Sequence, residues 1–278
     1  MDAGDHPEQD ESDLLSPEEI TQYQMLIGCA QWAVTLGRFD IQYATNTLAR
    51  YASMPRDGYF KRCLRLFGYL KHNGKARILF DPSDPDYTNI HFEDDFEWCD
   101  LYHPEAQEDI PNDTPMAMTQ PLQVTILSDA SHASDYITRR SVTGYLMLVG
   151  KTPIRSYSKR QNTVETSTYG SEMVALRIAI EAAIDIRYKL RMMGMGITDF
   201  VAVLGDNQST IVNTQFPSST LKKKHVSVSF HKCREAVAAG FAKTAFIPST
   251  MNISDILTKP KGPADHYRLI KNVLYGRQ

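Results

Sequence analysis

The sequence has little cysteine, no long apolar run and no obvious nucleophilic triad. Its four cysteines are far apart in 278 residues and form no Cys-x-x-Cys pair, which argues against a disulfide framework or a zinc knuckle. No apolar stretch approaches the roughly 20 residues of a membrane-spanning helix. The start of the chain is acidic and polar, unlike a signal peptide, so an intracellular protein is expected. Neither a Ser-His-Asp arrangement nor a glycine-rich phosphate loop is evident, which removes two common kinds of active site.

Basic residues are also missing from two segments. Residues 1–20 carry eight acidic residues and no lysine or arginine, and residues 81–120 carry twelve and none. Residues 21–80 carry nine basic against two acidic residues, and residues 121–278 carry twenty-one against eleven. Basic folded modules suit a phosphate backbone, although an ordinary solvated surface is the alternative interpretation. The chain is predicted to divide into a disordered acidic leader (1–15), a helical basic module (16–80), an acidic linker (81–120) and a second basic domain (121–275).

Hydrophobic periodicity differs between the two basic parts. In the first, Ser16-Pro17-Glu18-Glu19 is typical of a helix start, and three helices are predicted by apolar residues at helical spacing. In the second, three strands joined by short polar turns are followed by a long helix, which should return the next strand parallel to the first. The order βββαβαβα predicts an α/β domain with a mixed five-stranded sheet and flanking helices.

Four acidic residues stand where this pattern would bring them together. Asp129 and Asp206 each end an apolar strand, Glu172 lies near the start of the long helix, and Asp255 lies in a late helical segment. A single acid of this kind is usually a turn, cap or solvated residue, but the joint pattern favours a cluster. Clustered carboxylates repel one another and need cations. Oxygen ligands without His or Cys select Mg²⁺ or Mn²⁺, and four acids can hold two such ions for phosphodiester cleavage.

The same residues resemble a known family. The matching blocks are Asp129, Arg139–Tyr145, Ser158–Glu165, Ser167–Glu172, Gly205–Asn207, Lys224-His225 and Asn252–Pro260. In this order they resemble the ribonuclease H domain of copia-type (Pseudoviridae) retrotransposon Pol polyproteins. Upstream, Tyr23–Gly28, Gly37–Ile41 and Gly68–Lys71 resemble the thumb and connection of the same family's reverse transcriptase.

The resemblance implies a ribonuclease H-like fold and an endonuclease that cuts RNA in RNA–DNA hybrids with two Mg²⁺ ions, Mn²⁺ being possible. Carried over by position, Asp129, Glu172, Asp206 and Asp255 match the catalytic, metal-binding acids. The implied partners are the hybrid and the rest of the Pol polyprotein, in a cytoplasmic virus-like particle or the nucleus. The fingers, palm and catalytic aspartates of the polymerase are missing, so this chain alone should not polymerise DNA. The alternative is an inactive transposon remnant that only binds nucleic acid.

Several residues around the predicted cluster are candidates for nucleic-acid contact, with a solvated surface or a structural role as the alternative. They should grip the backbone by shape rather than by base sequence. These candidates are Lys159, Arg160, Gln161, Asn207, Lys222, Lys223, Lys224, His225 and Arg234.

Overall fold

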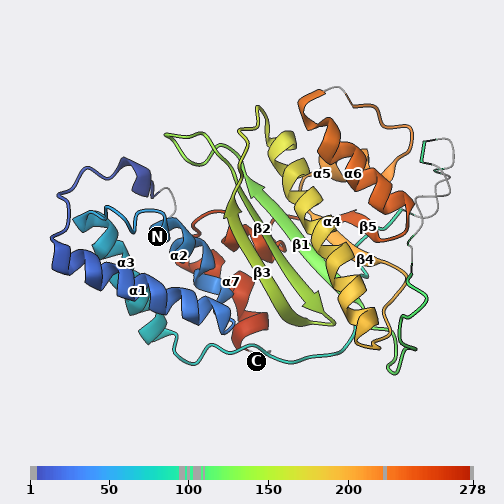
Figure 1. Cartoon of the computed structure of the whole chain (residues 1–278), viewed down its shortest axis with the longest axis horizontal. Helices are drawn as coiled ribbons and strands as arrows, with labels where there is room; N and C mark the ends of the chain where they lie inside the picture. The colour runs from blue at the N-terminus through green and yellow to red at the C-terminus, as the bar shows by residue number, and fades with distance from the viewer. Residues whose placement is uncertain are drawn as a thin grey trace.

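The computed structural model describes residues 5–93, 98, 101–102, 108, 110–221 and 224–275. It places a group of helices beside a mixed sheet, with the N-terminal helices on the left of Figure 1 and the sheet at its centre. None of the helices in the described parts is long and apolar enough to cross a membrane.

Three helices form the N-terminal module. Ser16 caps the first with a capping box to Glu19, as its sequence predicts. Tyr23, Leu48 and Cys63, one from each helix, are fully buried where the helices meet. The helices are α1 (Pro17–Thr35), α2 (Gln42–Ala49), which follows the 3-10 turn η2 (Phe39–Ile41), and α3 (Asp57–His72).

The second part is built on one sheet with the strand order β3-β2-β1-β4-β5. The β1–β2 and β2–β3 pairs are antiparallel, whereas the β1–β4 and β4–β5 pairs are parallel. The predicted mixed five-stranded sheet with flanking helices is therefore confirmed. The strands are β1 (Val124–Ser131), β2 (Val142–Val149), β3 (Thr152–Arg160), β4 (Val201–Gly205) and β5 (Ala242–Phe246). The helices that follow β3 are α4 (Thr168–Met192), α5 (Gln208–Gln215), η4 (Lys224–Val226), α6 (Ser227–Ala238), η5 (Ile253–Leu257), α7 (Pro263–Ile270) and the π-helical turn η6 (Lys271–Tyr275).

Helices cover both faces of this sheet (Figure 1). On one face, Ile126 belongs to the apolar core that α4 and α6 complete. On the other, Leu127 packs with residues of η5 and α7. Side chains alternate between faces along a strand, so Asp129 points to the same face as Leu127, toward η5.

The acidic leader has an ordered path between residues 5 and 15, where disorder was predicted. A 3-10 turn, η1, spans Pro7–Gln9, and Leu15 is buried against the three helices. Arg62 of α3 pairs with both Asp5 and Asp10, at 2.8 and 2.5 Å. These two ion pairs and the burial of Leu15 hold the leader against the helices. The acidic composition of the leader does not reveal these contacts.

The described parts of the predicted linker, within 81–93 and 110–120, contain no helix or regular strand. Tyr87 and Phe92 nevertheless pack on the core cluster of the η5 face, and the Phe92 ring lies 5.5 Å from that of Phe200. Gly150 has φ +58°, and a Cβ there would lie 2.9 Å from the Pro82 backbone, so the turn after β2 needs glycine. The division of the chain into four parts stays a prediction.

Candidate metal centre

Two aspartates lie side by side at one end of the parallel part of the sheet. Ser128 of β1 pairs with Gly205 of β4 in the parallel register, and an aspartate follows each of them: Asp129 within β1 and Asp206 just past the end of β4. This adjacency was expected from the helical crossover between the two strands.

The segment around η5 covers Asp129, which is only 2% exposed. Gly144 pairs with Asp129 across β1 and β2, and a Cβ on this glycine would lie 2.7 Å from Thr258 and 2.8 Å from Leu257. Only glycine allows so close an approach. The Thr258 hydroxyl donates a hydrogen bond to the Asp129 carboxylate, and Asn252 ties the same segment to the carbonyl of Ser128 at 2.9 Å.

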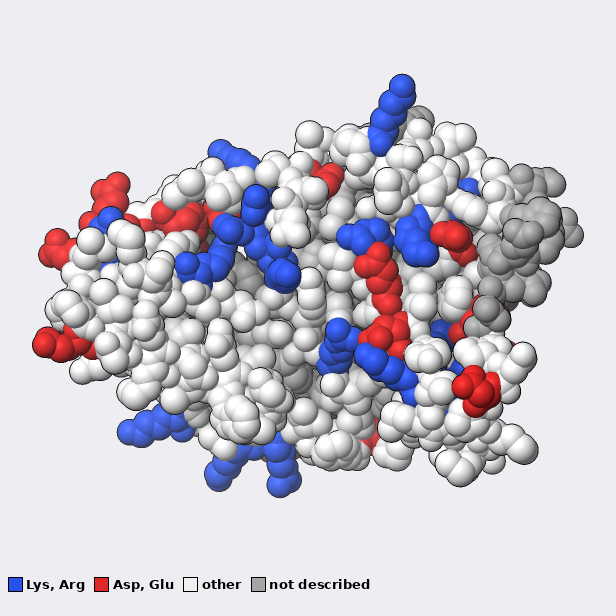
Figure 2. Space-filling model, viewed as in Figure 1, with Lys and Arg blue, Asp and Glu red and all other residues white. Residues whose placement is uncertain are grey.

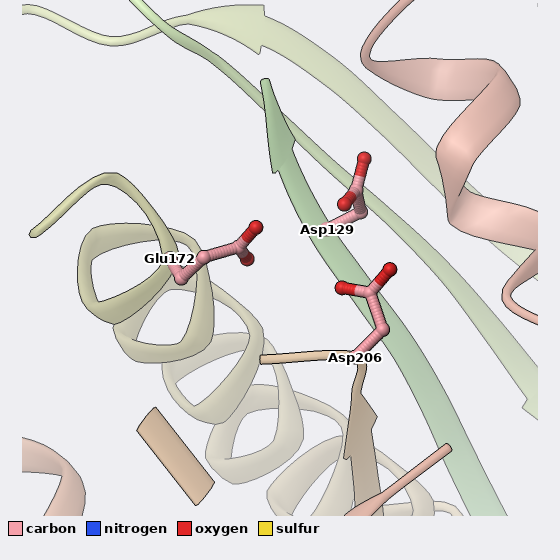
Figure 3. Close-up of side chains that lie close together, drawn as sticks. All are labelled: Asp129, Glu172 and Asp206. Atoms are coloured by element: carbon pink, nitrogen blue, oxygen red, sulfur yellow. The ribbon is translucent and has the colours of Figure 1, made fainter. Parts of the chain in front are cut away.

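Glu172 reaches the two aspartates from α4. Ser167 caps this helix by accepting from the N–H of Gly170, which sets Glu172 in the second turn beside the sheet edge. Figure 3 shows the three carboxylates turned toward one another, and one oxygen from each lies within 4.8 Å of the others. Three of the four predicted acids therefore meet in one cluster.

The cluster is electrostatically strained as long as no cation sits in it. Burial raises the pKa of Asp129 to about 7; Lys259 opposes the rise, whereas Asp255 and Asp206 add to it. Burial, followed by the charges of Asp129 and Asp206, also raises the pKa of Glu172 well above its usual value. A divalent cation between these groups would relieve both effects.

Asp255 lies outside this three-residue cluster. Its two oxygens are 2.5 Å from Lys259 Nζ and 2.5 Å from Lys261 Nζ, and Lys259 Nζ is also 3.9 Å from Asp129 Oδ2. Two ammonium groups thus neutralise the acid that was predicted as the fourth ligand. Sequence reasoning did not single out these lysines, although the i,i+4 spacing of Asp255 and Lys259 is a signal for such a pair.

The donor set of the cluster fits a hard divalent cation. Asp129, Glu172 and Asp206 offer only carboxylate oxygens, the ligands that Mg²⁺ and Mn²⁺ prefer. Three like charges that converge in this way would be costly to keep without a cation. The cluster can therefore hold a metal ion, whereas Asp255 can join only if its lysines move.

Four of the predicted nucleic-acid contacts lie where such a contact is possible. Lys159 is exposed at the end of β3, and Arg160 is partly exposed beside it. Lys224 and His225 are exposed at η4, where His225 Nε2 lies 3.7 Å from Glu165. Lys222 and Lys223 lie outside the described residues.

Two further candidates have local structural partners. Gln161 is 4% exposed, and its Nε2 donates to Thr143 Oγ1 and to the Ser171 carbonyl, at 3.0 and 2.9 Å. Its amide thus crosslinks β2 to α4, and the contact of Gln161 with nucleic acid stays a prediction. Asn207 caps α5 by accepting from the N–H of Thr210 at 3.0 Å, which leaves its amide nitrogen as a candidate contact.

Arg234, which is predicted as a phosphate contact, also has structural partners. It is 2% exposed, and its guanidinium donates to the backbone carbonyls of Asn213, Phe216, Pro217 and Ser219. The guanidinium thus holds together the segment after α5, and a phosphate contact by Arg234 stays a prediction. A basic residue in a helix gives no sequence signal that distinguishes this role from a solvated one.

We expect Arg234→Met to lower the free energy of unfolding by about 3 kcal/mol, because it leaves four partly buried carbonyls without their charged donor. Urea unfolding measures this change. Arg155→Met is the matched control, since Arg155 is 48% exposed and its pair with Asp185 should contribute little. Equal stability of the two variants would contradict the structural role.

Comparison with known proteins gives distant but extended matches. No protein-family profile matches the sequence. The chain is 22% identical over 240 residues to the Pol polyprotein of transposon RE2 from Arabidopsis thaliana, covering 86% of this chain and 14% of the relative. It is 24% identical over 252 residues to that of transposon TNT 1-94 from Nicotiana tabacum (91% and 16%). The match to the Ty1-JR2 Gag-Pol polyprotein of Saccharomyces cerevisiae is 21% over 257 residues (91% and 12%). The chain thus spans only about one seventh of these relatives, and its predicted resemblance to copia-type Pol polyproteins is confirmed.

Solved structures align with about half of the chain. RNase H1 from Halobacterium salinarum is 16% identical with a TM-score of 0.37, covering 50% of this chain and 95% of that one. LC11-RNase H1 in complex with an RNA/DNA hybrid is 18% identical with a TM-score of 0.39, covering 49% and 94%.

Proposed function

We propose that this chain, a relative of copia-type retrotransposon Pol polyproteins, is a ribonuclease H that hydrolyses the RNA strand of RNA–DNA hybrids during reverse transcription. The observation that carries the proposal is the meeting of Asp129, Glu172 and Asp206 within 4.8 Å at the ends of two parallel strands. The remainder of a Pol polyprotein is its proposed partner, and an intracellular compartment stays a prediction.

Asp129, Glu172 and Asp206 would hold Mg²⁺, with Mn²⁺ as a substitute. Bound divalent ions supply charge neutralisation at the phosphate and a more acidic water. Asp255 would be a ligand for a second ion only once the ammonium groups of Lys259 and Lys261 have left its oxygens. A phosphate group arriving at the cluster would offer these lysines a competing anion.

The chain's own residues would position the substrate. Asp129 is fixed by Thr258 and by the close approach of η5, so its carboxylate has little freedom to turn away. Lys259, next to the cluster, would place a positive charge beside the scissile phosphate. Lys159, Arg160, Lys224 and His225 are proposed to contact the backbone on either side.

Incubation of the purified chain with two labelled substrates, an RNA–DNA hybrid and duplex DNA, tests the proposal. With Mg²⁺, the RNA strand of an RNA–DNA hybrid should be cut, whereas duplex DNA of the same sequence should remain intact. Chelation of the metal should stop the reaction. Equal cleavage of hybrid and duplex DNA, or cleavage that survives chelation, would contradict the proposed activity.

A second candidate function is nucleic-acid binding without cleavage, in which case the chain would be an inactive transposon remnant. It is favoured by one observation, the pairing of both Asp255 oxygens with lysine side chains. If these ion pairs persist when the hybrid is bound, Asp255 is not available as the fourth carboxylate that a second ion would need. Tight hybrid binding without cleavage in either Mg²⁺ or Mn²⁺ would support this function against the first.

A further inference from the structure

A basic groove lies where the helical module meets the edge of the sheet. It has a volume of about 540 Å³ and runs between α2 and β3. Four cationic side chains line it: Arg50 just after α2, Arg140 from the turn before β2, and Lys159 and Arg160 from the end of β3. Figure 2 shows lysine and arginine side chains gathered over this junction. We call it the α2–β3 groove.

The two sides of the groove are fastened together by one carboxylate. Asp135 Oδ2 accepts from Arg50 Nη1 at 3.3 Å and from Arg160 Nη1 at 3.0 Å, and Asp135 is itself 7% exposed. Asn46 of α2 also donates to the Ser158 carbonyl of β3 at 2.8 Å. The groove is therefore a fixed feature of the junction, built by residues more than a hundred positions apart.

The other two cations have no acid of their own. Among the described residues, no carboxylate pairs with Arg140 or Lys159, so the groove keeps an excess of positive charge. Such a site suits a row of phosphates, because each guanidinium or ammonium that meets a phosphate releases counterions.

The position of the groove relates it to the metal centre. Asp129 pairs with Gly144 of β2, and Gly144 pairs with Ser158 of β3, next to Lys159. Two strand spacings correspond to about 10 Å, which is within the width of a duplex. A hybrid with one strand over the carboxylates would therefore bring its other strand to the α2–β3 groove.

We propose that the α2–β3 groove binds the phosphodiester backbone of the strand that is not cut, so that the helical module supplies part of the substrate site. The proposal rests on the proposed function for the identity of the two strands. Binding by the groove does not require cleavage, so the groove proposal and the proposed nuclease activity can fail separately.

The test compares two double variants of the full chain by hybrid binding in Ca²⁺. Arg140→Gln with Lys159→Gln should raise the Kd for a short RNA–DNA hybrid about tenfold. The slope of log K against log[salt] should become shallower by the amount that corresponds to about two lost phosphate contacts. The control, Lys61→Gln with Lys232→Gln, removes the same charge from exposed side chains of α3 and α6. Equal loss in both double variants would overturn the proposal.

The strand assignment needs a second comparison. Neutral methylphosphonate linkages in the DNA strand should remove the difference between the wild type and the groove variant. If neutral linkages in the RNA strand remove it instead, the groove holds the cut strand and the proposal is wrong.

A different observation concerns the acidic leader, which reaches the same region. The His6 ring stacks on Tyr136 at 3.8 Å, and Glu8 Oε1 accepts from the Tyr136 N–H at 3.0 Å. Tyr136 belongs to the turn that carries Asp135 and Arg140. Burial, opposed by Arg50, raises the pKa of the groove residue Tyr43, and the charges of Glu8 and Asp5 add to this rise.

A glycine makes this docking possible. A Cβ at Gly58 would lie 1.8 Å from Asp10 Oδ2, and Asp10 is held by Arg62. A side chain at residue 58 would therefore force the Asp10 carboxylate to move from its place beside Arg62. We infer that the leader is an internal competitor, which places carboxylates and a stacked ring at the rim of the groove and must yield when nucleic acid binds.

Two variants test this competition. Gly58→Ala should displace Asp10, speed hydrogen exchange at the Tyr136 N–H and tighten hybrid binding several-fold. Glu8→Gln should tighten binding without altering the packing at Gly58. Gly28→Ala is the matched control, since a Cβ there meets nothing within 4 Å. Unchanged affinity in both Gly58→Ala and Glu8→Gln would overturn the inference, even if exchange at Tyr136 is faster.

Discussion

Asp129→Asn is expected to abolish Mg²⁺-dependent cleavage of the RNA strand while leaving the fold intact. The amide keeps the shape of the side chain but removes the charge that Asp129 brings to the cluster with Glu172 and Asp206. Loss of one such electrostatic group should cost at least about 10²–10³-fold in rate. Single-turnover cleavage of a labelled hybrid measures the loss, and circular dichroism checks the fold.

Asp265→Asn serves as the control for Asp129→Asn. Asp265 lies in α7, its side chain is 64% exposed, and it pairs only with the neighbouring Arg268 in the described structure. It should keep the wild-type rate. Full activity of Asp129→Asn would mean that the hydrolytic centre lies elsewhere.

The metal-free protein should lose stability as pH rises from about 4 to about 7, and Mg²⁺ should restore it. Burial raises the pKa of Asp129 from 3.8 to about 7. Between these values the unfolded chain releases a proton that the folded chain retains, so the free energy of unfolding falls with rising pH. The fall attributable to this group is on the order of 2–4 kcal/mol. Below pH 4 both states are protonated, and the effect disappears.

Thermal unfolding with and without Mg²⁺ measures this linkage. At a hundredfold excess over its Kd, the ion should raise the melting temperature of the wild type by roughly 5–10 °C near pH 7. Asp129→Asn should be more stable than the metal-free wild type near pH 7 and should gain less from Mg²⁺. A wild type whose stability is unaffected by Mg²⁺ would count against a metal site at these carboxylates.

The adjacency of the two aspartates could be predicted from the sequence because it follows from topology. A helical crossover returns a strand parallel to its predecessor, and in the sequence Asp129 and Asp206 each follow an apolar stretch. Glu172 followed from its place near the start of α4. These are local patterns joined by one general rule, which is why three of the four predicted acids meet.

The contacts that the sequence did not reveal involve side chains whose partners are distant in the sequence. Whether Arg234 faces solvent or four carbonyls depends on where the segment after α5 folds, and Gln161 is buried because α4 packs beside β2. The leader is ordered by Arg62, some fifty residues away. Asp255 lay in the right segment, but its pairing with Lys259 and Lys261 depends on the path of the chain after η5.

Analysis of the RNA ends produced from an RNA–DNA hybrid tests the central claim most directly. If Asp129, Glu172 and Asp206 hold metal ions that activate water, the purified chain with Mg²⁺ should leave 5′-phosphate and 3′-hydroxyl ends on the RNA and an intact DNA strand. Asp129→Asn should give no product. No Mg²⁺-dependent product, or RNA ends with 2′,3′-cyclic phosphates, would contradict a metal-dependent hydrolytic centre at these carboxylates.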